Sequence, residues 1–193
     1  MKTRIIGSTP VWIILFLAFV CSQPLHAQSR YNLVANPTLK IDGSSNARNW
    51  SMTSTTATGN GQFTLQGGEL AGIQNLTVEL QAESLKSGTN GLDKKAYGAL
   101  DTKNNKTIRF TLRDLTGSGA TRQARGDLQL AGTSRPISFS VTVGKSGNNF
   151  TFEGSIPIKL TDFGIDPPTA VMGTIRTRDD ATISFNATFQ PAN

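Results

Sequence analysis

Strict alternation of apolar and polar residues between Arg125 and Val143 constrains the fold of this chain more than any other feature of its sequence. The apolar positions of this alternation are Leu128, Leu130, Ile137, Phe139, Val141 and Val143. A period of two is typical of strands in a sheet with one dry face and one wet face. Between the two halves, Ala131 to Arg135 predict a hairpin loop of about three to five residues. Pro136 then fits the start of the returning strand, where its missing N–H does least harm.

Most of the remaining chain repeats this pattern in short segments bounded by Gly and Asn clusters. The segments are Leu33 to Ile41, Trp50 to Thr58, Gln62 to Leu65, Leu76 to Leu80, Ile108 to Leu112, Phe150 to Ile158 and Ile183 to Phe189. With the hairpin they make about eight or nine strands, which favours an all-β sandwich or barrel. No linker marks a domain boundary, so a single domain is predicted for residues 28–193.

One segment, Gly91 to Leu100, departs from the period of two. Leu92, Ala96 and Leu100 are spaced four apart, Lys94 and Lys95 lie on the opposite side, and Asn90 is available near the N-cap. This spacing predicts a short amphipathic helix. A single helix in an all-β chain commonly covers one end of a barrel.

The first 27 residues have the pattern of a secretory signal peptide. Lys2 and Arg4 form a positive region, the apolar run Val11 to Val20 follows, and Ala27 offers a small residue at the cleavage position. The apolar run is too short to span a bilayer comfortably. Cys21 leaves a lipoprotein open as an alternative, although bulky residues precede it. A periplasmic or secreted location is therefore expected, with no membrane span after cleavage.

Cleavage after Ala27 removes the only Cys and the only His of the chain. The mature protein then has no disulfide, no thiol nucleophile and no imidazole base, and it lacks the usual ligands of zinc. Adjacent Asp179 and Asp180 would point to opposite faces of a strand, and Asp162 with Asp166 supply too few oxygens for a cation. The sequence therefore predicts no enzyme, no metal and no cofactor.

The charge of the chain does not indicate a nucleic-acid partner. The formal charge at pH 7 is +6, and it falls to +4 without Lys2 and Arg4. A surplus this small, spread along the chain and not interleaved with aromatic residues, is typical of a solvated surface.

Four segments together resemble one known family. Residues 126–141, GDLQLAGTSRPISFSV, resemble the central hairpin of the YceI-like family of secreted, lipocalin-like barrels that bind polyisoprenoid lipids. The segments Leu85 to Leu100, Thr107 to Leu112 and Ile158 to Ile175 are similar to other parts of the family, in the same order. The resemblance implies a closed antiparallel barrel of about eight strands, with one short helix and an isoprenoid in its apolar interior.

Two details qualify the resemblance. A His-Asp-Trp triplet is expected after the first turn, but this chain has Arg48, Asn49 and Trp50, so any polar role of the first two positions is not carried over. Asp162-Phe163-Gly164 matches a family motif, and we expect a turn with positive φ at Gly164 and with Phe163 docked at the barrel mouth.

The apolar strand faces supply the predicted ligand-binding residues. They are Trp50, Phe110, Leu112, Leu128, Leu130, Phe139, Val141, Phe150, Phe152, Phe163, Ile183 and Phe185. An eight-stranded barrel either just fills with side chains or holds one small ligand. Two functions therefore stay open: a carrier of a long isoprenoid or other apolar lipid, and a solid-cored structural or protein-interaction module of the cell envelope. A homodimer is compatible with either.

Overall fold

The fold is described from a computed structural model, which covers residues 27–192. Eleven strands occur in this range: β1 (Ala27–Leu33), β2 (Thr38–Ser45), β3 (Asn49–Ser54), β4 (Thr58–Gln66), β5 (Glu69–Gln81), β6 (Thr107–Thr116), β7 (Thr121–Leu130), β8 (Thr133–Ser146), β9 (Asn149–Lys159), β10 (Thr169–Ala170) and β11 (Ile175–Pro191). One α-helix, α1 (Asn90–Ala99), and two 3₁₀-helices, η2 (Ala82–Ser84) and η3 (Thr161–Phe163), complete the described elements.

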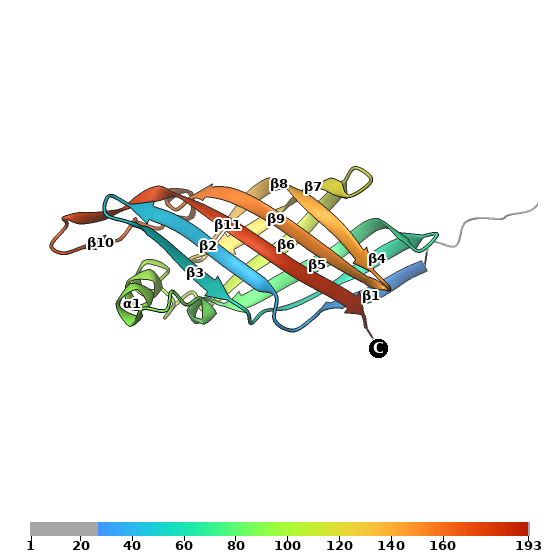
Figure 1. The fold of residues 1–193 in the computed structure, drawn as a ribbon, viewed down its shortest axis with the longest axis horizontal. Helices are drawn as coiled ribbons and strands as arrows, with labels where there is room; N and C mark the ends of the chain where they lie inside the picture. Colours follow the sequence, from blue (N-terminus) through green and yellow to red (C-terminus); the bar gives the residue numbers. More distant parts are fainter. Residues whose placement is uncertain (1–26, 193) are drawn as a thin grey trace, which may run out of the picture.

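The strands form a closed antiparallel barrel (Figure 1). The ring runs β1-β4-β5-β6-β7-β8-β9-β11 and closes because β1 pairs with both β4 and β11. The strands β2 and β3 continue the paths of β1 and β4, since β2 also pairs with β11 and β3 pairs with β2. The strands β1 to β4 thus form one long hairpin, whose two arms are interrupted at residues 34–37 and 55–57. The predicted eight-stranded barrel is confirmed.

The hairpin of β7 and β8 is tighter than predicted. Leu130 pairs with Thr133, so the loop has two residues, Ala131 and Gly132, with φ of 48° and 78°. Positive φ at both positions gives a turn whose twist matches that of the flanking strands. The prediction of a longer loop was wrong because residues 133–135 continue the ladder. Pro136 accordingly lies inside β8, where residues 133–140 pair with β7 alone.

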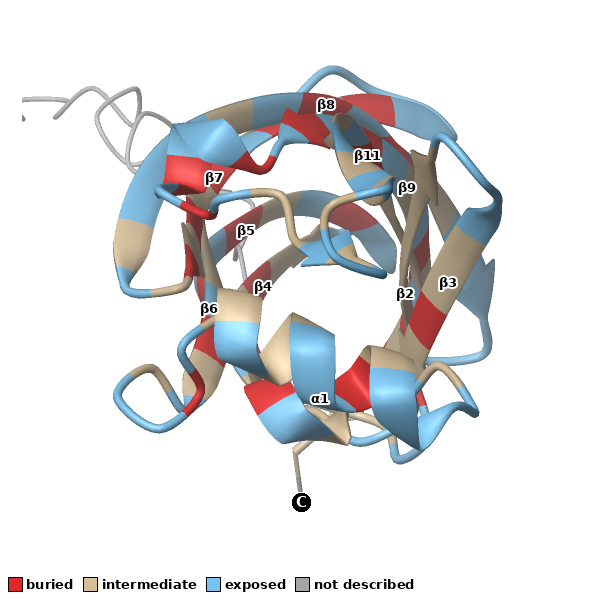
Figure 2. Ribbon diagram, turned by 90° about the vertical axis from the view of Figure 1, so that its left-hand side faces the viewer, coloured by how far each residue is buried: buried red, intermediate tan, exposed pale blue. Residues whose placement is uncertain are grey.

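The helix α1 lies at one end of the barrel, along the edge between β6 and β3 (Figure 2), and we call this end the mouth. It spans Asn90–Ala99, one residue earlier than predicted, and its N-cap is Thr89 rather than Asn90. Leu92, Ala96 and Leu100 face the barrel, as their spacing indicated.

Four aromatic side chains, Tyr31, Phe63, Phe150 and Phe189, fill the opposite end and are at most 2% exposed. We call them the aromatic plug. The rings of Tyr31 and Phe63 stack with centroids 4.3 Å apart, and Phe150 and Phe189 lie 5.9 Å and 5.7 Å from Phe63. Burial raises the pKa of the Tyr31 phenol, and this effect outweighs that of nearby Lys145, which lowers it. The plug closes the barrel at the end where β1 begins.

The predicted signal peptide lies outside the described residues, apart from Ala27, which is the first residue of β1. The same holds for Cys21 and His26. Within residues 27–192, no helix has the length and apolar character needed to cross a bilayer.

Candidate functional site

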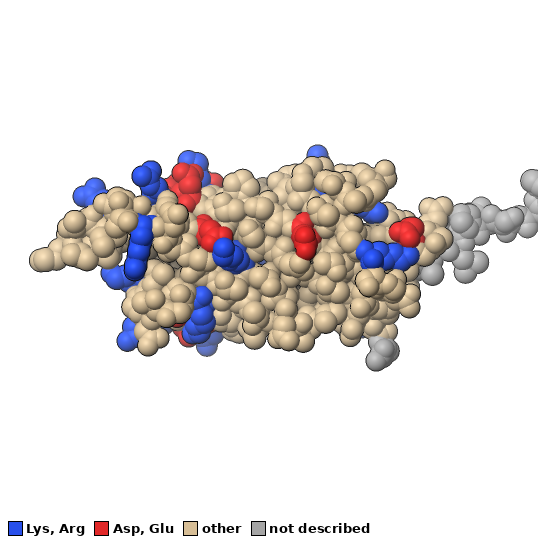
Figure 3. Space-filling model, viewed as in Figure 1, with Lys and Arg blue, Asp and Glu red and all other residues tan. Residues whose placement is uncertain are grey.

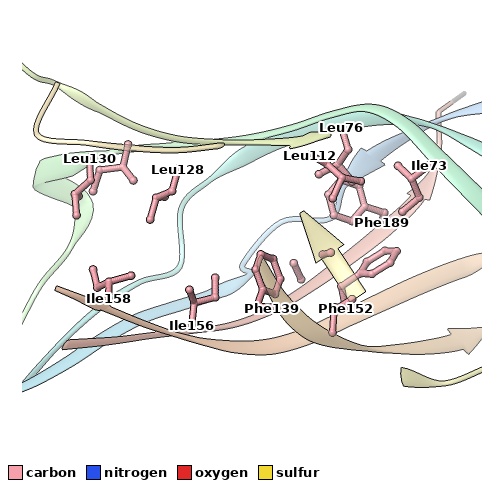
Figure 4. Close-up of a cluster of buried hydrophobic side chains, with 14 of the residues drawn as sticks. Ile73, Leu76, Leu112, Leu128, Leu130, Phe139, Phe152, Ile156, Ile158 and Phe189 are labelled. Carbon is pink, nitrogen blue, oxygen red and sulfur yellow. The ribbon is translucent and has the colours of Figure 1, made fainter. Parts of the chain in front are cut away.

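The barrel encloses a cavity of about 160 Å³ between the aromatic plug and the mouth. Its walls come from β2, from β5 to β9 and from β11, and Lys40 is the one lining residue that is not apolar. Leu112 and Leu128 on one wall face Ile156 and Phe139 on the other (Figure 4). A space with such walls can bind an apolar molecule.

Two glycines in the barrel wall make room for aromatic rings of neighbouring strands. A β-carbon at Gly154 would lie 2.6 Å from Phe185 Cζ, and one at Gly126 would lie 2.5 Å from Phe110 Cε2. The two rings therefore occupy the space that a side chain at these glycines would take, and both also contact the ring of Phe139, with centroids 5.7 Å and 5.6 Å away. A side chain larger than hydrogen at either glycine would displace the ring into the remaining space.

A second cavity, of about 70 Å³, lies beneath α1 at the mouth. Leu92, Ala96 and Leu100 of the helix region form its outer wall, together with residues of the barrel rim. Ile41, Leu85 and Leu130 line both cavities, so these three side chains stand between them. Apolar space thus runs from the barrel interior to the underside of the helix, interrupted by a few side chains.

The structure gathers most of the predicted ligand-binding residues around the larger cavity. Nine line it: Phe110, Leu112, Leu128, Leu130, Phe139, Val141, Phe152, Ile183 and Phe185. Trp50 lines the cavity beneath α1. Phe150 belongs to the aromatic plug, and Phe163 is buried in η3; neither lines either of these two cavities. Contact of any of these residues with a ligand stays a prediction.

Sequence reasoning missed several residues of the cavity wall. They include Ile73, Leu76, Val78, Leu80, Leu85, Ile108, Ala124, Ile156, Ala187 and Phe189. Ala124 could have been found because it has the same parity as Leu128 in β7. Leu85 could not, because it follows the 3₁₀-helix η2 and no strand pattern covers it.

The motif Asp162-Phe163-Gly164 closes a side of the barrel near the mouth. The strands β8 and β9 pair only between Val141 and Ser146 on the β8 side, so they separate toward the mouth. The 3₁₀-helix η3 lies there, with Phe163 buried and with Arg135 Nε donating to the Asp162 carbonyl at 2.6 Å. The predicted positive φ of Gly164 is confirmed, at 71°. The motif has a structural role at this point of the wall.

Hydrogen bonds hold the segment before α1 to the helix itself. The Ser87 hydroxyl and the Ser87 backbone N–H donate to Asp93 Oδ1 at 2.6 Å and 2.8 Å. These two bonds hold the pKa of the Asp93 carboxyl below its usual range, and the bond from the hydroxyl has the larger effect. Burial raises this pKa, but by less than the bonds lower it. Lys86 Nζ donates to the Tyr97 hydroxyl at 2.7 Å, which fixes the next turn of the helix. Polar contacts therefore attach the helix α1 to the segment that precedes it.

Replacing Asp93 by asparagine should make the stability of the fold depend less on pH in the acidic range. The folded protein lowers the pKa of Asp93. The ionised carboxyl therefore stabilises the fold fully when the pH is above the pKa of Asp93 in the unfolded chain, and this stabilisation is lost as the pH falls through its pKa in the folded protein. Thermal unfolding between neutral pH and about pH 2 should show a smaller fall in Tm for Asp93→Asn than for the unchanged protein.

Ser87→Ala, which keeps the carboxylate but removes one donor, should change the profile in the same direction by a smaller amount. Asp179 accepts from the Thr161 N–H and hydroxyl, its pKa is likewise lowered, and it accounts for acid dependence that remains in Asp93→Asn. Identical acid limbs in all the variants would contradict the assignment.

Among the described residues no group of three or more His, Cys, Asp or Glu side chains could hold a metal ion. Asp179 bonds to Thr161, and Asp180 lies 3.9 Å from Lys159. The two carboxylates thus have separate partners, as adjacent residues of a strand do.

Comparison with known proteins adds a family and a set of related folds. The family profile described as YceI-like domain matches residues 38–189. No curated protein sequence gives a match. Solved structures similar to this chain include BcnA of Burkholderia cenocepacia, with a TM-score of 0.67 and 17% identity over 79% of this chain and 95% of that one.

Two further structures have the same fold. A polyisoprenoid binding domain from Saccharophagus degradans, implicated in plant cell wall breakdown, has a TM-score of 0.63 and 12% identity over 84% of this chain and 98% of that one. The YCEI protein of Campylobacter jejuni has a TM-score of 0.57 and 17% identity over 78% and 85% of the two chains. At these identities the likeness is one of fold.

Proposed function

The chain belongs to the YceI-like family, and from this premise we propose that it is a binding protein that sequesters or carries a long apolar lipid, isoprenoid-like, inside the barrel. The observation that carries the proposal is the interior cavity with apolar walls. Transfer of apolar groups from water into such a space is favourable by about 0.8 kcal/mol for each CH₂. A ligand with many such groups can therefore bind tightly with few polar contacts.

The size of the cavity restricts how a long ligand can enter. A dry cavity of about 150 Å³ accommodates benzene, and the larger cavity here has about the same volume. A chain of several isoprene units requires more room than that. We propose that Ile41, Leu85 and Leu130 move aside when a ligand enters, so that the two cavities become one.

The cavity supports the first of the two functions left open by the sequence, the carrier of an apolar lipid, over the solid-cored structural or protein-interaction module. The hypothesis of a structural module assumes a barrel filled by its own side chains, whereas the side chains of this barrel leave space between facing walls. We therefore favour binding without catalysis, in the periplasm or outside the cell, as the proposed role.

The proposal is tested by purifying the protein from its native host without detergent and extracting it with organic solvent. Mass spectrometry of the extract should find an apolar lipid in roughly stoichiometric amount, and native mass spectrometry should show the same mass bound. An extract without lipid, together with no uptake of an apolar fluorescent probe by the extracted and refolded protein, would contradict the proposal.

A further inference from the structure

The loop between β10 and β11 carries two apolar side chains that project into solvent. Val171 is 66% exposed and Met172 is 105% exposed, and they are the exposed large hydrophobic residues among those the structure describes. We call them the apolar tip. The loop is the outermost part of the mouth end of the barrel, beyond α1 at the left of Figure 1.

The backbone of the apolar tip is held in a conformation that its residues disfavour. Val171 and Met172 both have φ of 51°, followed by Gly173 at 85°. Positive φ is common for Gly and Asn, but for a β-branched residue such as valine it is a genuine outlier. Local strain in exposed residues points to a function that the conformation serves.

Basic side chains surround the apolar tip. Lys95 Nζ donates to the Thr169 carbonyl at 3.0 Å, and Arg176 Nε donates to the Gly173 carbonyl at 3.1 Å. Arg48 lies in the turn of β2 and β3, which is joined to the loop by a bond of 2.9 Å from Asn46 Nδ2 to the Thr174 carbonyl. Within residues 27–192 none of these three cations forms a salt bridge. On the face drawn in Figure 3, several Lys and Arg side chains lie at this end, with acidic side chains beside some of them.

The apolar tip is also joined to the rim of the mouth cavity. Pro168, directly before β10, and Thr177, in β11, line the cavity beneath α1 and flank the loop on its two sides. The Thr177 N–H donates to the Pro168 carbonyl at 3.1 Å and connects them. Whatever the tip contacts therefore comes close to the helix-covered end of the barrel.

We propose that the mouth end docks on an anionic phospholipid bilayer, with Val171 and Met172 inserted at the boundary between headgroups and acyl chains and with Arg48, Lys95 and Arg176 against the lipid phosphates. Two side chains on a narrow loop bury far less than the roughly 1,000 Å² of a stable protein interface. A bilayer accepts single apolar side chains and attracts cations placed at its surface. The inference concerns the outer surface and does not depend on what occupies the interior.

Co-sedimentation with vesicles tests the docking. The full chain should bind vesicles of mixed phosphatidylglycerol and phosphatidylcholine at about 50 mM salt, and binding should weaken at about 500 mM salt. The double variant Val171→Ser with Met172→Ser should lower the partition coefficient about tenfold. Arg48→Gln should lower it about fivefold, and Lys95→Gln by a similar factor. Arg125→Gln, the same loss of charge on the side wall of the barrel, should have no effect.

A fluorescence measurement reports on the apolar tip itself. With Met172→Trp, the introduced indole should shift to shorter emission wavelength on anionic vesicles and be quenched by brominated acyl chains. Asn148→Trp places the same reporter in the turn between β8 and β9, at the opposite end, and should add no shift and no quenching to those of the unchanged protein, whose Trp50 emits in both variants. Residues 1–26 are the same in every variant, so differences between variants arise at the substituted positions.

Three outcomes would overturn the inference: no quenching of the Met172→Trp reporter, undiminished binding of the double serine variant, or equal quenching at both ends. Loss of binding to vesicles with retained binding to an acidic protein would also overturn it. Failure of the docking leaves lipid extracted from the interior unaffected, so the two proposals can fail separately.

Discussion

Replacing Ala124 by phenylalanine is expected to abolish uptake of an apolar ligand while the barrel remains folded. Ala124 is 3% exposed and lines the larger cavity beside Phe139, its partner in the register of the neighbouring strand β8. A benzyl side chain adds a ring of the size that a cavity of this volume holds. Titration with an apolar fluorescent probe should show at least a tenfold rise in Kd, because the space is already occupied.

Gln123→Phe is the matched control. Gln123 precedes Ala124 in β7 and is exposed, so its side chain lies on the outer face. The same bulk added there should leave the Kd unchanged. Circular dichroism and thermal unfolding should show both variants folded, since an added group that fills a void avoids most of the cost of overpacking. Equal affinity in the two variants would place the ligand outside the cavity.

Replacing Phe63 by alanine should produce the largest loss of stability. Phe63 is fully buried and contacts Tyr31, Phe150, Phe152 and Phe189. Removal of a buried phenyl group costs about 3–5 kcal/mol, because both its transfer free energy and its packing contacts are lost. Urea denaturation should measure this loss, and Tm should fall by about 2–4 °C for each kcal/mol.

Two variants define the specificity of this effect. Phe63→Leu should lose clearly less, because most of the plug remains filled. Thr64→Ala, the adjacent residue with its side chain on the other face of β4, should change the free energy of unfolding by less than about 0.5 kcal/mol. A similar loss in Phe63→Ala and Thr64→Ala would show that the plug contributes little to stability.

The alternation of apolar and polar residues was sufficient to predict which face of each strand turns to the barrel interior. Leu128 and Leu130 alternate with polar residues, and both turn inward as predicted. The spacing of Leu92, Ala96 and Leu100 likewise gave the helix and the side that it turns to the barrel. These features depend on residues close in the sequence, so a period of two or of 3.6 residues encodes them.

The sequence pattern could not predict where along the barrel axis an inward side chain lies. Phe150 and Phe152 have the same parity in β9 and face the same interior, yet one belongs to the aromatic plug and the other lines the cavity. The difference comes from the partners that distant strands bring to each level: Tyr31 and Phe63 stack at one level, and Leu128 and Ile156 leave space at another.

By itself, then, the sequence determined the class of fold, the inward and outward faces of most strands, the covering helix and the resemblance to a family. Only the tertiary structure decided that the interior is hollow and that Val171 and Met172 stand exposed at the mouth. The physical reason is that a void is a property of many side chains at once. Whether Phe110 and Phe185 fill the centre or lie against Gly126 and Gly154 depends on neighbouring strands, and no single segment encodes that arrangement.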